Sequence, residues 1–334
     1  MLRDVSERIL DGAYVPDPLC AVKIPKASGG FRTLRVATVR DRVVARAVLC
    51  AIESILDPRF LDNNHGFRPH RSPWTLLSGL EQMMIAHNQP ILVNADIRGA
   101  FDHVQISAVM EPMSRVIDNP DLLDLTETIL RGHSREEVGT AQGNPLSPIA
   151  LNVLLHDAHD LRIGDHTPSW WRYADNLGAA CHDVSDGHQH HTCIQTTLDR
   201  VGMTLKGNAD EDTIDLREGQ TSLLGYVLSI RHGRMRYETG PDAWRRLEDG
   251  LILAHHDIDP PMAAQAVVRG WIEWCGPTFA NKRAALPDRV HSIARRLGFR
   301  EIDPPERLGE IWEDSWMRWE EIRTSAIHAH DDER

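Results

Sequence analysis

Two short stretches of this sequence decide the fold, because each ends a run of apolar residues in an aspartate. Residues 90–104 read "PILVNADIRGAFDHV" and residues 171–178 read "WRYADNLG". The apolar run before Asp96 predicts a buried strand, and the second stretch predicts a strand hairpin with its turn at Asp175 and Asn176. Aspartates that follow neighbouring strands can meet at one edge of a sheet.

A pair of carboxylates held by a rigid sheet has a specific chemical use. Carboxylate oxygens bind hard divalent cations such as Mg²⁺. Two such ions about 3.5–4 Å apart promote in-line phosphoryl transfer, because one activates an attacking hydroxyl and the other neutralises the leaving pyrophosphate. Aspartate is also common at strand ends without any such role, so the pair alone leaves both interpretations open.

Composition indicates an ordinary globular protein. The chain has 334 residues, 41% hydrophobic and 26% charged, which is enough for two or three subdomains. The first residues, "MLRDVSERILDG", lack the apolar core of a signal peptide, and no apolar run is long enough to cross a bilayer. The five cysteines are odd in number and irregularly spaced, so we expect no disulfide framework, a cytoplasmic location and no membrane partner.

The negative net charge hides a basic front segment. The formal charge is −12, yet residues 21–71 contain ten Lys or Arg residues against four Asp or Glu residues. A local basic field can steer a polyanion even when the whole chain is acidic. A solvated face with an accidental excess of positive charge is the alternative.

Hydrophobic periodicity predicts an α+β region followed by helices alone. The stretch "AVKIPKASGGFRTLRVATV" is typical of a hairpin with its turn at residues 28–30. Helices are expected over 43–56, 72–87, 105–117, 120–131, from 147 onward and over 188–201, with a further strand over 221–230. Four more helices are expected at 241–255, 262–275, 282–297 and 310–327.

Seven segments resemble, in this order, the consecutive sequence blocks of bacterial reverse transcriptases, most closely those of the group II intron type. They are "VKIPKASGGFRTLRVATVRDRVVARAV", "DNNHGFRPHRS", "VNADIRGAFDHV", "GTAQGNPLSP", "RYADN", "VGMTLK" and "LLGYVLS". The later "VVRGWIEWC" is similar to the thumb of that family. The resemblance implies an α+β right-hand polymerase, with fingers over 1–90 and 131–165, a ferredoxin-like palm over 91–235, and a helical thumb with a C-terminal helix over 240–334.

The resemblance also implies an RNA-directed DNA polymerase that extends a primer 3′-hydroxyl with dNTPs. Asp96 and Asp175 match the aspartates that bind two Mg²⁺ or Mn²⁺ ions, assisted by the backbone carbonyl of Ile97, and Asn176 completes the catalytic group. The implied partners are an RNA template, a DNA or RNA primer and dNTPs. A non-coding RNA or a second polymerase subunit stays open as a further partner.

Other matched positions contact the nucleotide or the nucleic acid in this family. The nucleotide-binding positions are Lys26, Arg32, Phe101, Gln142 and Gly143. The template- and primer-contacting positions are Arg68, Arg71, Leu224, Gly225 and Tyr226. Lys26 and Arg32 suit a triphosphate as a point charge and a bidentate fork. Phe101 falls where bulk against the sugar 2′ position favours deoxynucleotides, with a core aromatic as the alternative.

Three features depart from the family pattern. Asn176 replaces the second aspartate of the Tyr-X-Asp-Asp turn, which lowers the negative charge at the metal site and favours Mn²⁺. An acidic run follows Lys206, where the family has a cation that protonates pyrophosphate, and Lys206 is the local candidate for that role. The chain starts almost at the fingers hairpin and shows no endonuclease segment after the thumb, which favours a stand-alone enzyme, host-adopted or in antiviral defence. The alternative is a decayed reverse transcriptase that binds RNA or a partner polymerase subunit.

Two smaller signals lie outside these blocks. "CHDVSDGHQHHTC" begins at Cys181 and ends at Cys193, and it gathers metal-ligand residue types without the spacing of a common zinc finger. A strand end, loop and helix start is the favoured interpretation, and a zinc site is the alternative. Trp312, Trp316 and Trp319 form a helical stripe, for which we favour core packing over a docking face for a partner.

Overall fold

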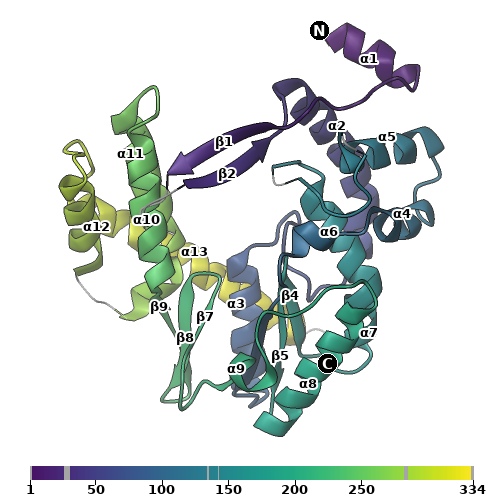
Figure 1. The fold of residues 1–334 in the computed structure, drawn as a ribbon. Helices are drawn as coiled ribbons and strands as arrows, with labels where there is room; N and C mark the ends of the chain where they lie inside the picture. The colour runs from purple at the N-terminus through teal and green to yellow at the C-terminus, as the bar shows by residue number, and fades with distance from the viewer. Residues whose placement is uncertain (1, 26–30, 134, 142, 282–284, 332–334) are drawn as a thin grey trace.

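Three sheets organise the chain, as the computed structural model in Figure 1 shows. The structure describes residues 2–25, 31–133, 135–141, 143–281 and 285–331. The sheets are the hairpin β1-β2, a four-stranded sheet in the order β4-β5-β3-β6, and a three-stranded sheet in the order β7-β8-β9. We call the four-stranded sheet the central sheet. Within the described residues, no helix is both long and apolar enough to cross a membrane.

All strand pairs in these sheets are antiparallel. The strands are β1 (Cys20–Pro25), β2 (Phe31–Val36), β3 (Ile91–Asp96), β4 (Trp170–Tyr173), β5 (Asn176–Cys181), β6 (Thr213–Asp215), β7 (Thr221–Leu223), β8 (Tyr226–Arg231) and β9 (Arg234–Thr239). The expected pairing of the strands before and after residues 26–30, the strand before Asp96 and the hairpin around Asp175 are therefore confirmed. The turn expected at residues 28–30 lies outside the described residues.

The helices cover the expected periodic segments, and two more, over residues 2–10 and 209–212, were not predicted. They are α1 (Leu2–Leu10), α2 (Val39–Leu56), α3 (Pro73–Glu81), α4 (Ile106–Ser114), α5 (Pro120–Arg131), α6 (Ser147–Leu155), α7 (Leu161–Gly164), α8 (Val184–Asp199), α9 (Ala209–Asp212), α10 (Pro241–Ala254), α11 (Pro260–Trp274), α12 (Ala285–Arg296) and α13 (Pro305–Asp331). Local capping explains several of the starts. Ser72 accepts from the Thr75 N–H and Pro73 fills the first turn of α3.

The central sheet is covered on both faces. Successive side chains of a strand point to opposite faces, so neighbouring residues of one strand belong to different cores. Ile91 and Val93 join a core with residues of α2, α4, α6 and α8. Leu92 and Trp171 join a second core with α3, the β7-β8-β9 sheet and Trp319 of α13. Burial on both faces makes the sheet a rigid base for the residues at its ends.

A third core lies in the C-terminal helices and is formed by buried residues of α10, α11, α12 and the start of α13. We call these elements the helical module, and Figure 1 places α10 to α12 on the opposite side of the molecule from α4 to α8. Trp312 packs into this core, whereas Trp319 packs under the central sheet. Trp316 stacks on Phe279 with ring centroids 5.3 Å apart. The tryptophan stripe is therefore core packing, as expected.

Two expected elements are different in the structure. The single strand expected over 221–230 is a hairpin, because Leu224 and Gly225 have φ of 51° and 94° and form a two-residue turn between β7 and β8. The loop expected after α8 contains the short strand β6, which pairs with β3 at the edge of the central sheet. Three residues are too few for an alternation pattern to show in the sequence.

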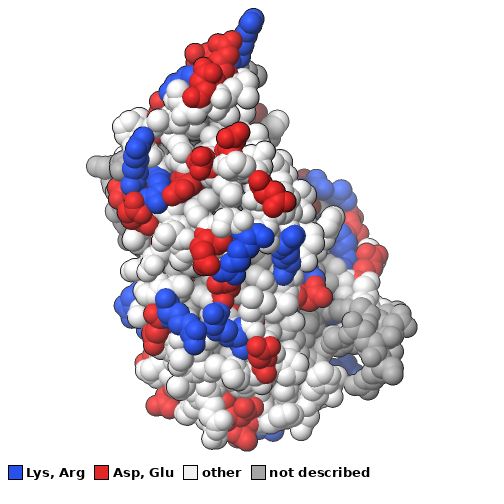
Figure 2. Space-filling view, turned by 90° about the vertical axis from the view of Figure 1, so that its right-hand side faces the viewer, with Lys and Arg blue, Asp and Glu red and all other residues white. Residues whose placement is uncertain are grey.

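Charge on the surface is mixed in sign. Figure 2 shows Lys and Arg interspersed with Asp and Glu over the face turned to the viewer. Part of the basic excess over residues 21–71 is also neutralised locally. Arg40 pairs with Asp17 at 2.6 Å, and Arg68 pairs with Asp57 at 2.8 Å. Asp57 is one of the four acids already counted, whereas Asp17 lies outside the segment and lowers its excess of positive charge by one.

Candidate active site

Asp96 and Asp175 lie at the same end of the central sheet. Asp96 is the last residue of β3 and pairs in register with Asn176, the first residue of β5. The Ile97 N–H donates to the Asp175 carbonyl at 3.0 Å and ties the end of β3 to the β4–β5 turn. Both aspartates are half-buried. The structure therefore brings together the two aspartates that the strand pattern singles out.

The turn that carries Asp175 begins one residue earlier than expected. Asn176 pairs with Tyr173, so the turn consists of Ala174 and Asp175 rather than Asp175 and Asn176. Ala174 has a φ of 58°, which is uncommon for a residue with a Cβ and indicates that the surroundings hold the turn in place. Gly66 packs against it so closely that a Cβ there would lie 2.2 Å from the Ala174 nitrogen.

A lysine supplies positive charge to the two carboxylates. Lys206 Nζ lies 2.7 Å from Asp96 Oδ1, and the Lys206 N–H donates to the Asp96 carbonyl at 2.8 Å. Asp96 Oδ1 is buried from solvent, and the Lys206 ammonium group is its compensating charge. Burial raises the pKa of Asp175, the Asp96 carboxylate raises it further, and Lys206 lowers it.

The donor atoms at this end of the sheet fit a hard divalent cation. Asp96 and Asp175 present carboxylate oxygens, which are the ligands that Mg²⁺ and Mn²⁺ prefer. The Asn176 amide nitrogen lies 3.4 Å from Asp175 Oδ1, and a 180° rotation of the amide would place its oxygen there instead. A cation bound to Asp96 would compete with the Lys206 ammonium for the same carboxylate.

Phe101 lies in a short 3₁₀ helix (Ala100–His103) that follows β3. Its ring is half-buried and meets the ring of Phe67 edge-on at 6.4 Å. The Phe101 carbonyl accepts from the Thr140 N–H at 2.8 Å, so the loop that carries Gly143 begins beside it. Gly143 is exposed and has a φ of 94°, a backbone conformation that favours glycine.

The other predicted nucleotide-binding residues are Lys26, Arg32 and Gln142, whose side chains lie outside the described part of the structure. Lys26 and Gln142 lie outside the described residues. Arg32 belongs to β2, where its backbone pairs with Ile24 of β1.

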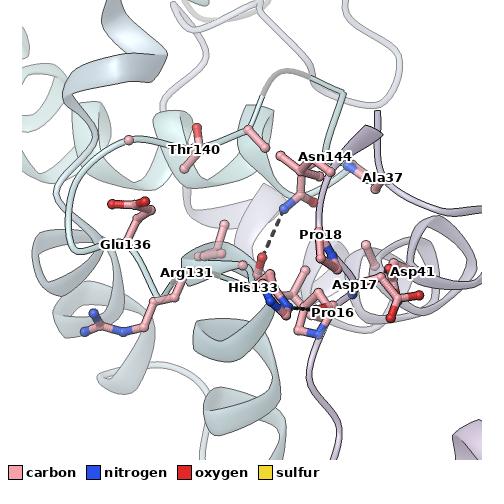
Figure 3. Close-up of a pocket in the computed structure, with 18 of the residues that line it drawn as sticks. Pro16, Asp17, Pro18, Ala37, Asp41, Arg131, His133, Glu136, Thr140 and Asn144 are labelled. Atoms are coloured by element: carbon pink, nitrogen blue, oxygen red, sulfur yellow. Dashed lines mark hydrogen bonds between the residues drawn. The ribbon is translucent and has the colours of Figure 1, made fainter. Parts of the chain in front are cut away.

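A pocket of about 590 Å³ opens beside the same loop. Figure 3 shows His133 next to Pro16, with Asp41 and Arg131 also at the wall, and the Asn144 amide donates to the Ile129 carbonyl at 3.2 Å. Two of the charged groups of this wall are paired within the chain. Asp41 accepts from the Tyr14 hydroxyl at 2.8 Å, and Arg131 pairs with Glu127 at 2.7 Å. Asp96 and Asp175 do not line the pocket, so it is separate from the paired aspartates.

Arg68 shapes its own loop instead of facing a ligand. Its side chain is 6% exposed and donates to the Asp57 carboxylate and to the carbonyls of Leu61 and Asn64. The prediction that Arg68 contacts the template is therefore wrong for its guanidinium group. Arg71 is more accessible and pairs with the exposed Asp62 at 2.5 Å.

The predicted primer-contacting turn lies against the helical module. A Cβ at Gly225 would come within 2.9 Å of the Trp274 ring, so space as well as φ favours glycine there. Tyr226 is fully buried, and its ring stacks on Trp274 with centroids 4.1 Å apart. Its hydroxyl donates to the Trp274 carbonyl and accepts from Trp74 Nε1 at 2.9 Å. The prediction that the Tyr226 side chain contacts a primer is therefore wrong, and Leu224 and Gly225 remain at the turn.

A buried polar network, which the sequence did not reveal, holds the β4–β5 turn. Arg172 of β4 is 0% exposed, and its guanidinium donates to both oxygens of Asp160, at 2.8 and 2.6 Å. The same group donates to Asn152 Oδ1 at 2.8 Å and to the Ala174 carbonyl at 3.2 Å. Asn152 in turn donates to the Gly66 carbonyl at 2.8 Å. The sequence feature that could have indicated this network is the arginine inside the apolar run "SWWRY".

Comparison with known proteins identifies the class. Residues 24–208 match the family described as reverse transcriptase (RNA-dependent DNA polymerase), a segment that contains both paired aspartates and Lys206. The chain therefore belongs to the reverse transcriptase family and has its α+β right-hand polymerase fold.

The curated relatives indicate the group II intron type. The chain is 29% identical over 164 residues to the group II intron-encoded protein LtrA of Lactococcus lactis, which covers 47% of this chain and 27% of LtrA. It is 30% identical over 166 residues to the protein YkfC of Escherichia coli, which covers 47% of this chain and 44% of YkfC. The matches thus span less than half the length of these relatives. Among solved structures, a telomerase from Candida albicans is similar with a TM-score of 0.47 and 9% identity, over 91% of this chain and 62% of that chain.

Proposed function

We propose that this protein is an RNA-directed DNA polymerase that extends a primer 3′-hydroxyl with dNTPs by a two-metal mechanism. The observation that carries the proposal is the convergence of Asp96 and Asp175 at one end of the central sheet, with Lys206 as their counter-charge. Two bound divalent ions would supply the activation of the hydroxyl and the neutralisation of pyrophosphate.

The residues around the ions have distinct tasks in this proposal. Asp96, Asp175 and the Ile97 carbonyl hold the cations, and Asn176 lowers the total negative charge, which favours Mn²⁺ over Mg²⁺. Lys206 is half-exposed and anchored by its backbone to Asp96. A cation held by Asp96 would replace the Lys206 ammonium as the partner of this carboxylate, and the ammonium group would then be available to the phosphates.

We assign the remaining tasks from the sequence blocks that these residues match. Phe101 stands against the sugar 2′ position, and Lys26, Arg32, Gln142 and Gly143 bind the incoming nucleotide. Arg71, Leu224 and Gly225 face the template and primer. The fingers cover residues 1–90 and 131–165, the palm covers 91–235, and the helical module is the thumb. From the sequence alone we also propose an antiviral role, a cytoplasmic location, and a non-coding RNA or a second polymerase subunit as a further partner.

A decayed reverse transcriptase that binds RNA or a partner polymerase subunit is the second candidate. Two observations favour it. Asn176 removes a carboxylate, and the ion pair with Lys206 already neutralises Asp96 without a metal.

Primer extension separates the two candidates. The purified chain is given RNA or DNA templates, a primer and dNTPs, with Mg²⁺ or Mn²⁺. We expect incorporation, and we expect Asp96→Ala to lower it by at least about 10²-fold because an electrostatic stabiliser is lost. Asp165→Ala, the same change at an exposed aspartate outside the site, is the control and keeps activity. Equal incorporation by Asp96→Ala contradicts the site, and no incorporation by the wild type in any condition favours the decayed enzyme.

A further inference from the structure

A second group of metal-ligand side chains lies at the far end of β5. Among the described residues, Cys181, Asp186 and His190 each bring one ligand atom within 4.8 Å of the others. Cys181 ends β5 and is fully buried, while Asp186 and His190 stand in the first two turns of α8. Asn176 begins the same strand, so at about 3.3 Å per residue this group lies about 17 Å along β5 from the candidate active site.

The helix and the strand place these three residues together for a geometric reason. Asp186 and His190 are four residues apart and therefore share one face of α8. That helix packs on the face of the central sheet to which Cys181 contributes. His190 Nε2 lies 3.3 Å from Asp186 Oδ1. Ligands of a tetrahedral zinc ion with bonds of about 2.0–2.1 Å are about 3.4 Å apart, so these two atoms already have the separation of zinc ligands.

The neighbouring histidines of α8 are paired elsewhere. His191 Nε2 lies 3.0 Å from an Asp212 oxygen, and His188 Nε2 lies 3.4 Å from an Asp210 oxygen. Both of these acids belong to α9. His190 instead turns toward β5 and is the histidine of this helix that joins the cysteine.

An outer hydrogen bond orients the group, and two of its side chains are accessible to solvent. Asp186 Oδ2 accepts from the His182 N–H at 3.4 Å, which is the kind of outer contact that orients a metal-binding carboxylate. The side chains of His190 and Asp186 are 14% and 36% exposed, so an ion and a water molecule have a route to the group.

We propose that Cys181, Asp186 and His190 bind one Zn²⁺, with water as the fourth ligand. A thiolate and an imidazole select zinc over magnesium, whereas the oxygen donors at Asp96 and Asp175 prefer magnesium or manganese. Binding releases the thiol proton of Cys181 to solvent, and the sulfur enters as thiolate. The ion joins the end of β5 to α8 and stabilises their packing. This proposal is independent of polymerase activity.

Metal titration of the full chain tests the site. The protein is stripped with a chelator and titrated with Zn²⁺, or with Co²⁺ as a spectroscopic probe. We expect one zinc per chain after dialysis, a cobalt–thiolate absorption band, and no displacement by excess Mg²⁺. His190→Gln should weaken zinc binding by more than the roughly 10–100-fold that loss of an outer-shell partner costs. His188→Gln, on the same helix, is the matched control and should bind as the wild type does.

Cysteine variants complete the test. Cys181→Ser should abolish the cobalt–thiolate band, and Cys193→Ser should keep it. Because Cys181 is buried and its variant can fail to fold, circular dichroism accompanies both measurements. If Cys181→Ser is unfolded, the zinc affinity of His190→Gln decides the test. The proposal is overturned if the wild type binds no zinc at micromolar metal, or if His190→Gln binds zinc as tightly as the wild type.

Discussion

Different kinds of interaction stabilise the central sheet and the helical module, each within itself. Beside the sheet, Arg172 and Asp160 form an ion pair in which both side chains are 0% exposed. In the helical module the buried groups are mainly aliphatic and aromatic, and Trp271 donates its Nε1 proton to the Ala243 carbonyl at 2.8 Å. A buried ion pair rarely adds stability beyond an apolar pair, but its bidentate hydrogen bonds fix the relative orientation of the two side chains. The difference indicates that the sheet needs a defined position for the turn with Asp175, whereas the module needs only close packing.

Removal of one member of the buried pair should have the largest effect. Arg172→Met leaves the Asp160 carboxylate buried without its arginine partner, which costs about 3–5 kcal/mol of unfolding free energy. Urea denaturation measures the loss. The double variant Arg172→Met/Asp160→Leu should regain most of the stability but not polymerase activity, because the Ala174 carbonyl keeps no donor from residue 172. Full recovery of both would show that the pair has no positioning role.

A cavity in the helical module should weaken that module alone. Trp271→Ala removes a side chain that is 8% exposed and should cost about 3 kcal/mol. Hydrogen exchange measured by peptide should then quicken in α10 to α12 and stay unchanged in β3 and β5. Equal acceleration in both regions would show that sheet and module unfold as one unit, against the contrast drawn above.

Acid should destabilise the central sheet through His159. Its ring is buried with Nδ1 2.7 Å from Thr197 Oγ1, and burial, aided by Arg172, lowers its pKa to about 4. Because the folded pKa lies below the unfolded value of about 6.5, stability is full above pH 6.5 and falls as the pH drops toward 4, by about 2 kcal/mol at pH 5. Thermal melts from pH 7 to pH 4.5 measure this slope. His159→Asn keeps a hydrogen-bonding group without the titration and should make the slope shallower, while His65, whose burial lowers its pKa to about 3, still contributes to it. An equally steep slope in that variant would rule His159 out.

Loss of the lysine beside Asp96 should barely change stability. The Lys206 side chain is 52% exposed, so Lys206→Ala should cost less than about 0.5 kcal/mol. It should instead lower the metal concentration needed for half-maximal primer extension, because the cation no longer competes with an ammonium group, and lower the maximal rate. Lys206→Arg keeps the charge and is the control. An unchanged metal dependence in Lys206→Ala would show that the ion pair with Asp96 has no part in metal binding.

The sequence predicts those parts of the fold whose signals are local. The apolar run before Asp96 and the Ser72 cap of α3 are set by neighbours in the chain, and the structure has both. The turn at Leu224 and Gly225 also had a local signal, a glycine at a position of positive φ, but the apolar residues on either side masked it. The three-residue strand β6 had no local signal at all.

Partnerships between distant residues could not be predicted. Arg172 and Asp160 are twelve residues apart, and no spacing rule connects a strand arginine with an acid at the end of a helix. The burial of Tyr226 depends on Trp74 and Trp274, which come from two other elements. A family match gives such a residue a position in a motif but not its exposure. The same holds for Lys206, whose contact with Asp96 depends on how its loop folds back.

The metal dependence of primer extension, measured for the wild type and for Asn176→Asp, is the decisive measurement for the paired-aspartate site. We expect the wild type to incorporate dNTPs better with Mn²⁺ than with Mg²⁺. We expect Asn176→Asp, which restores a carboxylate beside Asp175, to lower the Mg²⁺ concentration for half-maximal rate and to reduce the difference in rate between the two metals. Identical metal dependence in an active wild type and in Asn176→Asp would show that residue 176 has no influence on the ions, against this assignment.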